Sequence, residues 1–281
     1  PENGPPRLEA LRRIMEAEGV DGFLIPRADV HQGEYVAPCD DRLAWLTGFT
    51  GSAGFCAALR DQAGVFVDGR YRVQVKHQVD LGSFTPVHWP ETGLAEWLTA
   101  RMNKGQTLAI DPWLHTVKEG LALATALEDK GVDLRETDNL LDRIWEDRPA
   151  PPTEPVMVYP DALAGRSAED KRTSLAADLR KAGQSAAVLT LPDSLNWLLN
   201  IRGADIPRNP IAQCLGILHD DGTVTLFIDA KKLEGIAPLE GVTIAAPAGF
   251  ATALSELTGK VAVDYGTAPL AVYRALRAAG A

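Results

Sequence analysis

The sequence contains the same pattern twice, once in each half of its 281 residues. In each half, a tryptophan in a short apolar segment is followed by two apolar stretches that both end in aspartate. Trp45 and Asp111 are 66 residues apart in the first half, and Trp197 and Asp264 are 67 residues apart in the second. Matching order and nearly equal spacing predict that one structural unit has been duplicated.

Each half alternates short apolar strands with amphipathic helices, which is typical of an α/β layer fold. The first helix of each half ends at a glycine, Gly19 or Gly183, the residue that most easily adopts the left-handed conformation after a helix. Strands are predicted at 20–26, 64–68 and 107–111 and again at 186–191, 224–229 and 260–264. Later helices are predicted at 94–102 and 117–130 and again at 250–257 and 270–279. We therefore expect a mixed β-sheet with helices on both faces in each half.

A proline-rich stretch divides the chain near its middle. Residues 148–155 read Arg-Pro-Ala-Pro-Pro-Thr-Glu-Pro, and proline disrupts both helices and central strands. Such a segment is typical of a stiff, extended linker. The sequence thus predicts two domains, 5–148 and 156–281, joined by a linker at 149–155.

The overall composition excludes some classes of function. The formal net charge is −10, which disfavours nucleic acid as a partner because phosphates attract clustered Lys and Arg. No apolar run approaches the roughly 18 residues that a membrane span requires, so no membrane partner is expected. The three cysteines are scattered and form no CxxC pair, which argues against a zinc knuckle. Reduced cysteines are typical of a cytoplasmic protein.

No catalytic constellation stands out among the polar residues. The stretch 48–54, Gly-Phe-Thr-Gly-Ser-Ala-Gly, lacks the first glycine of a GxSxG nucleophile elbow, so we expect a structural loop. None of the five histidines lies in an HExxH pair or beside carboxylates at metal-ligand spacing. His31 is the most notable of them, because Gln32, Glu34 and Tyr35 surround it in a predicted loop. We expect no catalytic residue and no metal ligand in this chain.

The cluster Asp68-Gly69-Arg70-Tyr71 is the strongest local candidate for a binding role. It follows a predicted strand, and strand ends are where α/β sheets place ligands. A guanidinium there can hold a peptide carbonyl or carboxylate through two parallel hydrogen bonds. The alternative is a purely structural ion pair between Asp68 and Arg70. In the second half, the polar segment 201–210 is interpreted as an ordered connecting loop.

Several of these segments together resemble the three-domain aminopeptidase P family. The first-half segments are His31–Asp40, Gly48–Gly54 and Asp68–Tyr71, and the segment Ile144–Pro149 is similar to that family's link between its first two domains. In the second half, Trp197–Ile206 with Asn209-Pro210 resembles the signature of the family's second domain. The matches occur in order along essentially the whole chain.

The resemblance implies both a fold and an activity. Family members carry two creatinase-like N-terminal domains before a pita-bread catalytic domain, and they are metallopeptidases that release an N-terminal residue preceding proline. Their catalytic domain holds two divalent ions, commonly manganese, and its ligands would lie beyond Ala281. The resemblance thus implies that the catalytic domain is absent from this chain, that the chain has no cofactor of its own, and that the fragment alone is inactive. By position, Arg70 matches a family residue that touches the substrate peptide, and Glu34 falls beside it.

The resemblance also implies partners. They are a peptide substrate with a penultimate proline, the chain's own C-terminal catalytic domain and a second copy in a homodimer. The alternative is a stand-alone peptide-binding or interaction module without a catalytic domain, and the reading frame after Ala281 distinguishes the two. A prolidase or creatinase with a single N-terminal unit does not fit, because this chain carries two.

Overall fold

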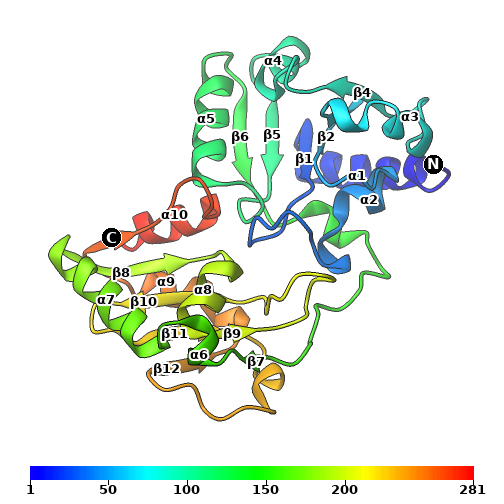
Figure 1. Cartoon of the computed structure of the whole chain (residues 1–281). Coiled ribbons are helices and arrows are strands. Elements are labelled where there is room, and N and C mark those ends of the chain that lie inside the picture. Colours follow the sequence, from blue (N-terminus) through cyan, green and yellow to red (C-terminus); the bar gives the residue numbers. More distant parts are fainter. The chain divides into compact units, whose positions relative to one another are not determined.

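The computed structural model describes residues 1–281, which separate into two compact units (Figure 1). The first unit comprises residues 1–29 and 34–150, and the second comprises residues 30–33 and 151–281. The division between residues 150 and 151 falls inside the segment predicted as a linker. None of the helices is both long and apolar enough to cross a bilayer.

The first unit is built on one six-stranded sheet in the order β4-β3-β2-β1-β5-β6. Its strands are β1 (Gly22–Pro26), β2 (Phe55–Leu59), β3 (Ala63–Val67), β4 (Thr85–His88), β5 (Thr107–Ile110) and β6 (Asp133–Glu136). Its helices are α1 (Gly4–Glu18), α2 (Arg42–Thr47), α3 (Gln74–Gln78), α4 (Leu94–Arg101) and α5 (Val117–Glu128), with 3-10 turns η1 (Pro38–Asp40), η2 (Gly69–Tyr71) and η3 (Leu140–Arg143). The β1–β2 and β2–β3 pairs are antiparallel, and the other pairs are parallel.

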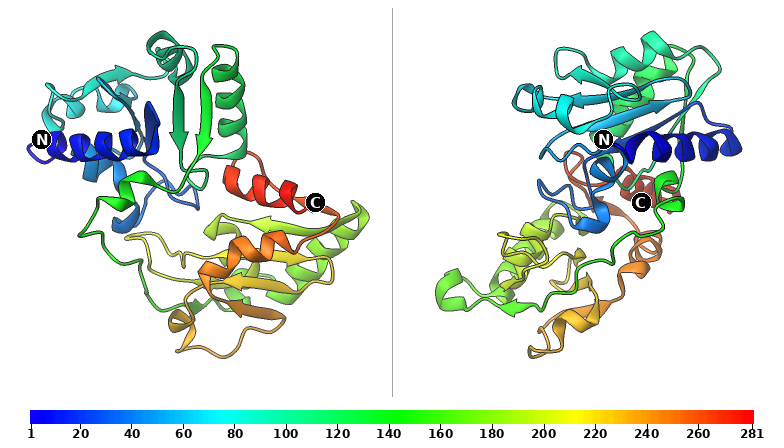
Figure 2. Two further views of the ribbon diagram at one scale, coloured as in Figure 1. Left: turned by 180° about the vertical axis from the view of Figure 1, so that it is seen from behind. Right: turned by 90° about the vertical axis from the view of Figure 1, so that its right-hand side faces the viewer.

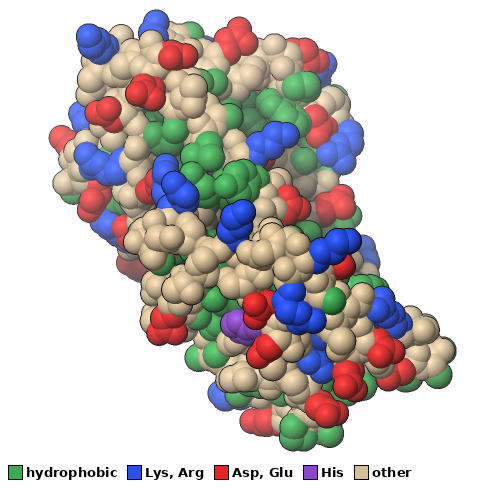
Figure 3. Space-filling model, turned by 90° about the vertical axis from the view of Figure 1, so that its left-hand side faces the viewer, with side chains coloured by type: hydrophobic (Ala, Val, Ile, Leu, Met, Phe, Trp, Pro, Cys, Tyr) green, Lys and Arg blue, Asp and Glu red, His purple; other side chains and the backbone are tan.

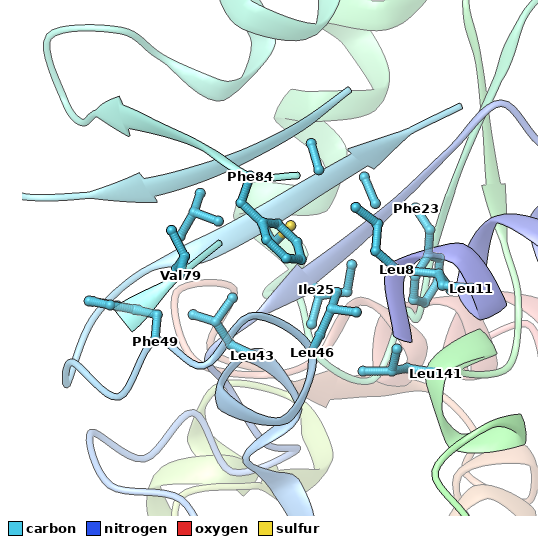
Figure 4. Close-up of a cluster of buried hydrophobic side chains, with 14 of the residues drawn as sticks. Leu8, Leu11, Phe23, Ile25, Leu43, Leu46, Phe49, Val79, Phe84 and Leu141 are labelled. Carbon is cyan, nitrogen blue, oxygen red and sulfur yellow. The ribbon is translucent and has the colours of Figure 1, made fainter. Parts of the chain in front are cut away.

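The two faces of this sheet bury different helices, because successive side chains of a strand point to opposite faces. Phe23 and Ile25 of β1 belong to the core that also contains Leu8 and Leu11 of α1, and Figure 4 shows these side chains packed together. On the opposite face, Phe66 of β3 makes an edge contact with Trp97 of α4, with ring centroids 5.5 Å apart. The first unit is therefore a helix–sheet–helix sandwich, as the sequence predicts.

The second unit contains a five-stranded sheet in the order β12-β11-β10-β8-β13 and a two-stranded pair, β7-β9. Its strands are β7 (Met157–Val158), β8 (Gln184–Leu189), β9 (Ile201–Arg202), β10 (Leu215–His219), β11 (Val224–Phe227), β12 (Val242–Ala245) and β13 (Lys260–Ala262). Its helices are α6 (Asp161–Ala164), α7 (Ala168–Lys181), α8 (Pro192–Leu199), α9 (Phe250–Ser255) and α10 (Leu270–Ala278), with 3-10 turns η4 (Ala230–Leu233) and η5 (Pro247–Gly249). Figures 1 and 2 show α8 and α9 on opposite faces of the larger sheet.

The strand orders confirm the predicted duplication. The order β4-β3-β2-β1-β5 in the first unit corresponds strand by strand to β12-β11-β10-β8-β13 in the second. The directions agree as well, since β8–β10 and β10–β11 are antiparallel while β11–β12 and β8–β13 are parallel. Gly19 follows α1 and Gly183 follows α7, and both glycines have a φ of 68°. The strand β6 of the first unit has no counterpart in the second.

The two repeated tryptophans occupy equivalent places but are not equally buried. In the first unit, the Arg7 guanidinium carbon lies 4.3 Å from the ring centroid of Trp45, and Arg7 Nη1 donates to the Trp45 carbonyl at 2.5 Å. In the second unit, Lys171 Nζ lies 4.3 Å from the ring centroid of Trp197 and donates to its carbonyl at 2.7 Å. Arg7 is the fourth residue of α1, and Lys171 is the fourth residue of α7.

A tryptophan in an apolar helical segment is expected to be mostly buried, but Trp197 is 48% exposed. Trp45 is partly buried against the core and stacks on Trp145, with ring centroids 5.3 Å apart. No aromatic ring stacks on Trp197 in the way that Trp145 stacks on Trp45, which accounts for its greater exposure.

Ion pairs and hydrogen bonds stabilise the C-terminal end of the first unit. This is the segment that resembles the aminopeptidase P family's link between its first two domains. Arg42 Nε and Nη2 donate to the two oxygens of Asp142 at 2.7 and 3.0 Å. Arg148 Nη1 donates to Asp142 at 2.8 Å, and Arg148 Nε donates to the Cys39 carbonyl at 2.7 Å. These bonds fix the chain just before the prolines that separate the units.

Candidate substrate-contact site

The predicted cluster at residues 68–71 forms a compact turn at the end of β3. Asp68 caps the 3-10 turn η2, because its Oδ1 accepts a hydrogen bond from the Arg70 backbone N–H at 2.9 Å. The Arg70 side chain folds back on the same carboxylate, donating through Nε at 3.1 Å and Nη2 at 2.8 Å. The ion pair between Asp68 and Arg70, which the sequence predicts as the alternative to a binding role, is therefore present in the structure.

This ion pair leaves the guanidinium accessible. The Arg70 side chain is 60% exposed, while that of Asp68 is only 19% exposed. The hydrogen bond from Arg70 lowers the pKa of Asp68, and the same bond raises the pKa of Arg70. A pair this exposed contributes little to the stability of the fold. Asp68 therefore acts mainly to orient a guanidinium that faces solvent.

Glu34, the second predicted contact residue, lies close enough to Arg70 for its charge to act on it. Its carboxylate contributes to the raised pKa of Arg70, after the larger effect of Asp68. The position of Glu34 is set by Arg27, whose guanidinium donates to the Glu34 carbonyl oxygen. The structure thus brings Arg70 and Glu34, which are distant in sequence, into one exposed cluster of charges.

A hydrogen-bonded network beneath this cluster holds three loops together. The Tyr71 hydroxyl lies 2.5 Å from Ser52 Oγ and accepts from the Ser52 backbone N–H at 3.1 Å. These bonds lower the pKa of Tyr71. Arg27 Nη1 donates to the Ser52 carbonyl at 3.0 Å, and the Arg70 guanidinium carbon lies 4.9 Å from the Tyr71 ring centroid. The turn that carries Arg70 is therefore braced from below.

The glycine-rich stretch 48–54 is the structural loop that its sequence predicts. A side chain at Gly51 would collide with the Phe49 ring, since a Cβ there would lie 2.2 Å from the ring edge. Phe49 is buried and meets Tyr71 edge to face, with ring centroids 5.5 Å apart. Glycine at 51 allows the loop to close over Phe49, and this loop in turn supports Tyr71.

The charged groups of this site can both donate and accept hydrogen bonds. An exposed guanidinium can donate two parallel hydrogen bonds to a carboxylate or carbonyl, and the nearby Glu34 carboxylate can accept from an amine or amide N–H. No histidine or cysteine belongs to this network. The arrangement therefore offers a hydrogen-bond donor and an acceptor near each other on the surface.

The histidines and cysteines take structural places. His31 is buried in the second unit, where its Nδ1 lies 3.2 Å from the Thr190 carbonyl. His115 is buried in the first unit without a partner for Nε2, and burial lowers its pKa to about 4. The burial of His115 is not evident from the sequence, because a lone histidine in a turn belongs to no periodic pattern. No group of three or more His, Cys, Asp or Glu side chains could hold a metal ion.

Two asparagines, Asn196 and Asn200, are buried in or beside the signature segment of the second half and organise the backbone around them. Asn200 adopts a left-handed conformation, with φ of 50°, and its side chain bonds Asp161, the Arg166 carbonyl and Lys171. Asn196 binds the backbone N–H and carbonyl of Ala212. The segment 201–210 begins with strand β9, which the sequence did not predict, and continues as the expected connecting loop.

Comparison with known proteins agrees with this division into two units. The model of the creatinase/prolidase N-terminal domain matches residues 7–144, and a second model of the same description matches residues 147–281. The chain belongs to the creatinase/prolidase N-terminal domain family. It carries two such domains in tandem, which confirms the predicted fold class and the family resemblance.

The most similar curated relatives are fungal. A probable Xaa-Pro aminopeptidase P of Coccidioides posadasii is 40% identical over 231 residues, covering 81% of this chain and 38% of the relative. A probable Xaa-Pro aminopeptidase P of Aspergillus clavatus is 38% identical over 235 residues, covering 82% of this chain and 36% of the relative. The chain therefore spans well under half the length of these relatives.

One solved structure matches both creatinase/prolidase N-terminal domains at once. The X-prolyl aminopeptidase from Caenorhabditis elegans aligns with 96% of this chain and 48% of its own, at 28% identity and a TM-score of 0.89. That protein is described as a cytosolic enzyme with a di-nuclear active site. This one alignment covers both domains together, whereas each family model matches a single domain.

Proposed function

We propose that this chain is the non-catalytic N-terminal region of a proline-specific metalloaminopeptidase, which removes an N-terminal residue that precedes proline. The observation that carries this proposal is the alignment of nearly the whole chain with an X-prolyl aminopeptidase, at a TM-score of 0.89. The curated relatives support it independently, since they are named for the same activity.

The chemistry would belong to a region outside these residues. The chain's own side chains do not fit a di-nuclear metal site, because no three His, Cys, Asp or Glu side chains come close enough to share an ion. We propose that two divalent ions, manganese by family resemblance, are held by the remaining part of the protein. The chain alone would then neither bind these ions as a pair nor turn over peptide.

Within this proposal the first unit contributes contacts to the substrate peptide. Arg70 is exposed, oriented by Asp68 and braced through Tyr71, and Glu34 lies beside it. A guanidinium fixed in this way loses little conformational freedom when it binds a peptide carbonyl or carboxylate. The rest of the two domains would supply surfaces for the catalytic domain and for a second copy in a homodimer.

The surface and the relatives also support the remaining parts of the proposal. Figure 3 shows acidic and basic side chains interspersed on the face drawn, and the formal net charge of −10 does not favour nucleic acid. A cytoplasmic location is proposed by analogy with the cytosolic enzyme from Caenorhabditis elegans.

The direct test is peptidase activity of the purified chain and of the natural protein that contains it. With added Mn²⁺, the longer protein should release the first residue of an X-Pro peptide and spare a matched X-Ala peptide, whereas the chain alone should release nothing. Turnover by the chain alone would overturn its non-catalytic role. A reading frame without a catalytic region would instead favour a stand-alone peptide-binding or interaction module.

A further inference from the structure

The second unit leaves open one edge of its sheet that is covered in the first. In the first unit, β6 pairs in parallel with β5, from Thr107↔Asp133 to Ile110↔Glu136. In the second unit, the corresponding strand β13 is the last in the order and has no outer partner. An unpaired strand edge presents backbone N–H and C=O groups that readily accept another strand.

Residues near the open edge of the second unit are more exposed than the equivalent residues of the first unit. All four residues of β5 are buried, whereas Lys260 of β13 is exposed and Val261 and Ala262 are only partly buried. The same holds for the neighbouring central strand. Pairing registers make Ile25 of β1 equivalent to Leu189 of β8, and Ile25 is 1% exposed while Leu189 is only partly buried.

A second, independent difference between the two units concerns the equivalent residues Trp45 and Trp197. Trp45 and Trp197 are held alike on one face, by Arg7 and by Lys171. The other face of Trp45 stacks on Trp145, at 5.3 Å and an interplanar angle of 21°. Trp145 lies nine residues after the end of β6, so the same stretch of chain that pairs with β5 also covers Trp45. Trp197 has no stacked aromatic partner of this kind and is 48% exposed.

The element between the paired strands is present in both units. In the first unit, α5 joins β5 to β6, and in the second, α10 follows β13 in the same way. A helix of this kind is the crossover that two parallel strands require. The second unit thus contains counterparts of β5 and α5, while none of its strands corresponds to β6.

We propose that the outer edge of β13 and the open face of Trp197 form one docking surface for the polypeptide that continues from α10 in the longer protein. The segment adds as a sixth strand parallel to β13, and an apolar or aromatic side chain about nine residues further on stacks on Trp197. This inference rests on the proposed function, because that function requires a longer protein. The first unit supplies the pattern, since β6 and Trp145 do the same within this chain.

Hydrogen exchange and fluorine NMR on this chain and on the longer natural protein test the proposal. Within Lys260–Ala262, the amides that point away from β8 should exchange at least about tenfold more slowly in the longer protein, because paired strand amides open rarely. With 5-fluorotryptophan, the resonance assigned through Trp197→Phe should lose most of its H₂O/D₂O solvent shift. The internal controls are β5 and Trp45, which are already covered and should not change between the two proteins.

Each outcome of these two measurements either supports or overturns the proposed docking surface. Unchanged exchange at β13 together with an unchanged Trp197 resonance would overturn the proposal. Protection that depends on protein concentration would assign the edge to a second copy and overturn it as well. A longer protein that protects β13 but lacks peptidase activity would keep this inference and reject the proposed function, and an active protein with an open β13 edge would do the reverse.

Discussion

The Asp205 carboxylate accepts a hydrogen bond from the Lys232 ammonium, with Oδ2 and Nζ 2.7 Å apart and neither side chain more than 6% exposed. Asp205 also accepts from the Gln213 backbone N–H at 2.7 Å and from the Glu154 backbone N–H at 3.2 Å. The Lys232 carbonyl in turn accepts from Val156 at 2.8 Å. This buried pair therefore joins the beginning of the second unit to the loop at 201–213.

Replacing one member of the pair should strongly destabilise the second unit. Asp205→Asn leaves the Lys232 charge buried without its counter-ion, which typically costs about 3–5 kcal/mol of unfolding free energy. Urea unfolding followed by amide exchange in β10 and β11 measures this cost. Glu9→Gln is the control, because Glu9 forms an exposed pair with Arg13 at 3.7 Å. Equal unfolding free energies for the two variants would show that the buried pair is not a major support.

Buried His115 should make the first unit sensitive to acid. Burial lowers the pKa of His115 from 6.5 to about 4, so the unfolded chain binds the proton more readily between these values. Stability is therefore present above pH 6.5 and is lost as the pH falls toward 4, by up to about 3 kcal/mol. The test compares urea unfolding of the wild type and His115→Leu from pH 4 to 7. Stability curves of equal slope for the two proteins would contradict the assignment.

The two equivalent tryptophans should contribute unequally to stability in this chain. Trp45→Ala removes a ring that stacks on Trp145 and packs against the core, so a loss of about 3 kcal/mol is expected. Trp197→Ala removes a ring that is 48% exposed and should cost about 1 kcal/mol. Urea unfolding of the two variants gives the comparison. Equal losses would mean that the open face of Trp197 carries no energetic consequence.

The short-range features of this fold follow directly from the sequence. The glycines after α1 and α7 end those helices because glycine adopts positive φ without strain. The apolar stretches at β3 and β5 are recognisable because each is followed directly by an aspartate, Asp68 or Asp111. The repeat predicts that the two units share a topology, because similar sequences in the same order fold alike.

Long-range features did not follow from the sequence. The strand β2, Phe55–Leu59, has two alanines and little β-branched character, and only its pairing with β1 and β3 makes it a central strand. The exposure of Trp197 depends on a covering segment remote in sequence, which helical periodicity cannot reveal. Arg70 is a candidate from its place after a predicted strand and Glu34 only through the family resemblance, whereas the supporting contacts of Tyr71 and Arg27 are tertiary and leave no pattern in the sequence.

All three thiols should be inert in the folded protein. Burial raises the pKa of Cys56 and Cys214 to about 12 and that of Cys39 to about 11, and the thiolate is the reactive form. Ellman's reagent at pH 8 should therefore label none of the native thiols within minutes and all three after denaturation. Rapid labelling of a native thiol, located by mass spectrometry, would contradict the packing around that residue.

The most direct test of the account is the kcat/KM of the longer protein on an X-Pro peptide series, with and without Arg70. Arg70→Ala should lower kcat/KM for the longer peptides about 10- to 100-fold, because a charge-assisted hydrogen bond to the substrate is lost. Arg60→Ala is the matched control, since Arg60 is 54% exposed and pairs with Asp21 at 2.9 Å in a similar exposed ion pair. The account predicts that only Arg70→Ala impairs cleavage. Equal kcat/KM for both variants and the wild type would contradict it and leave Arg70 as no more than the partner of Asp68.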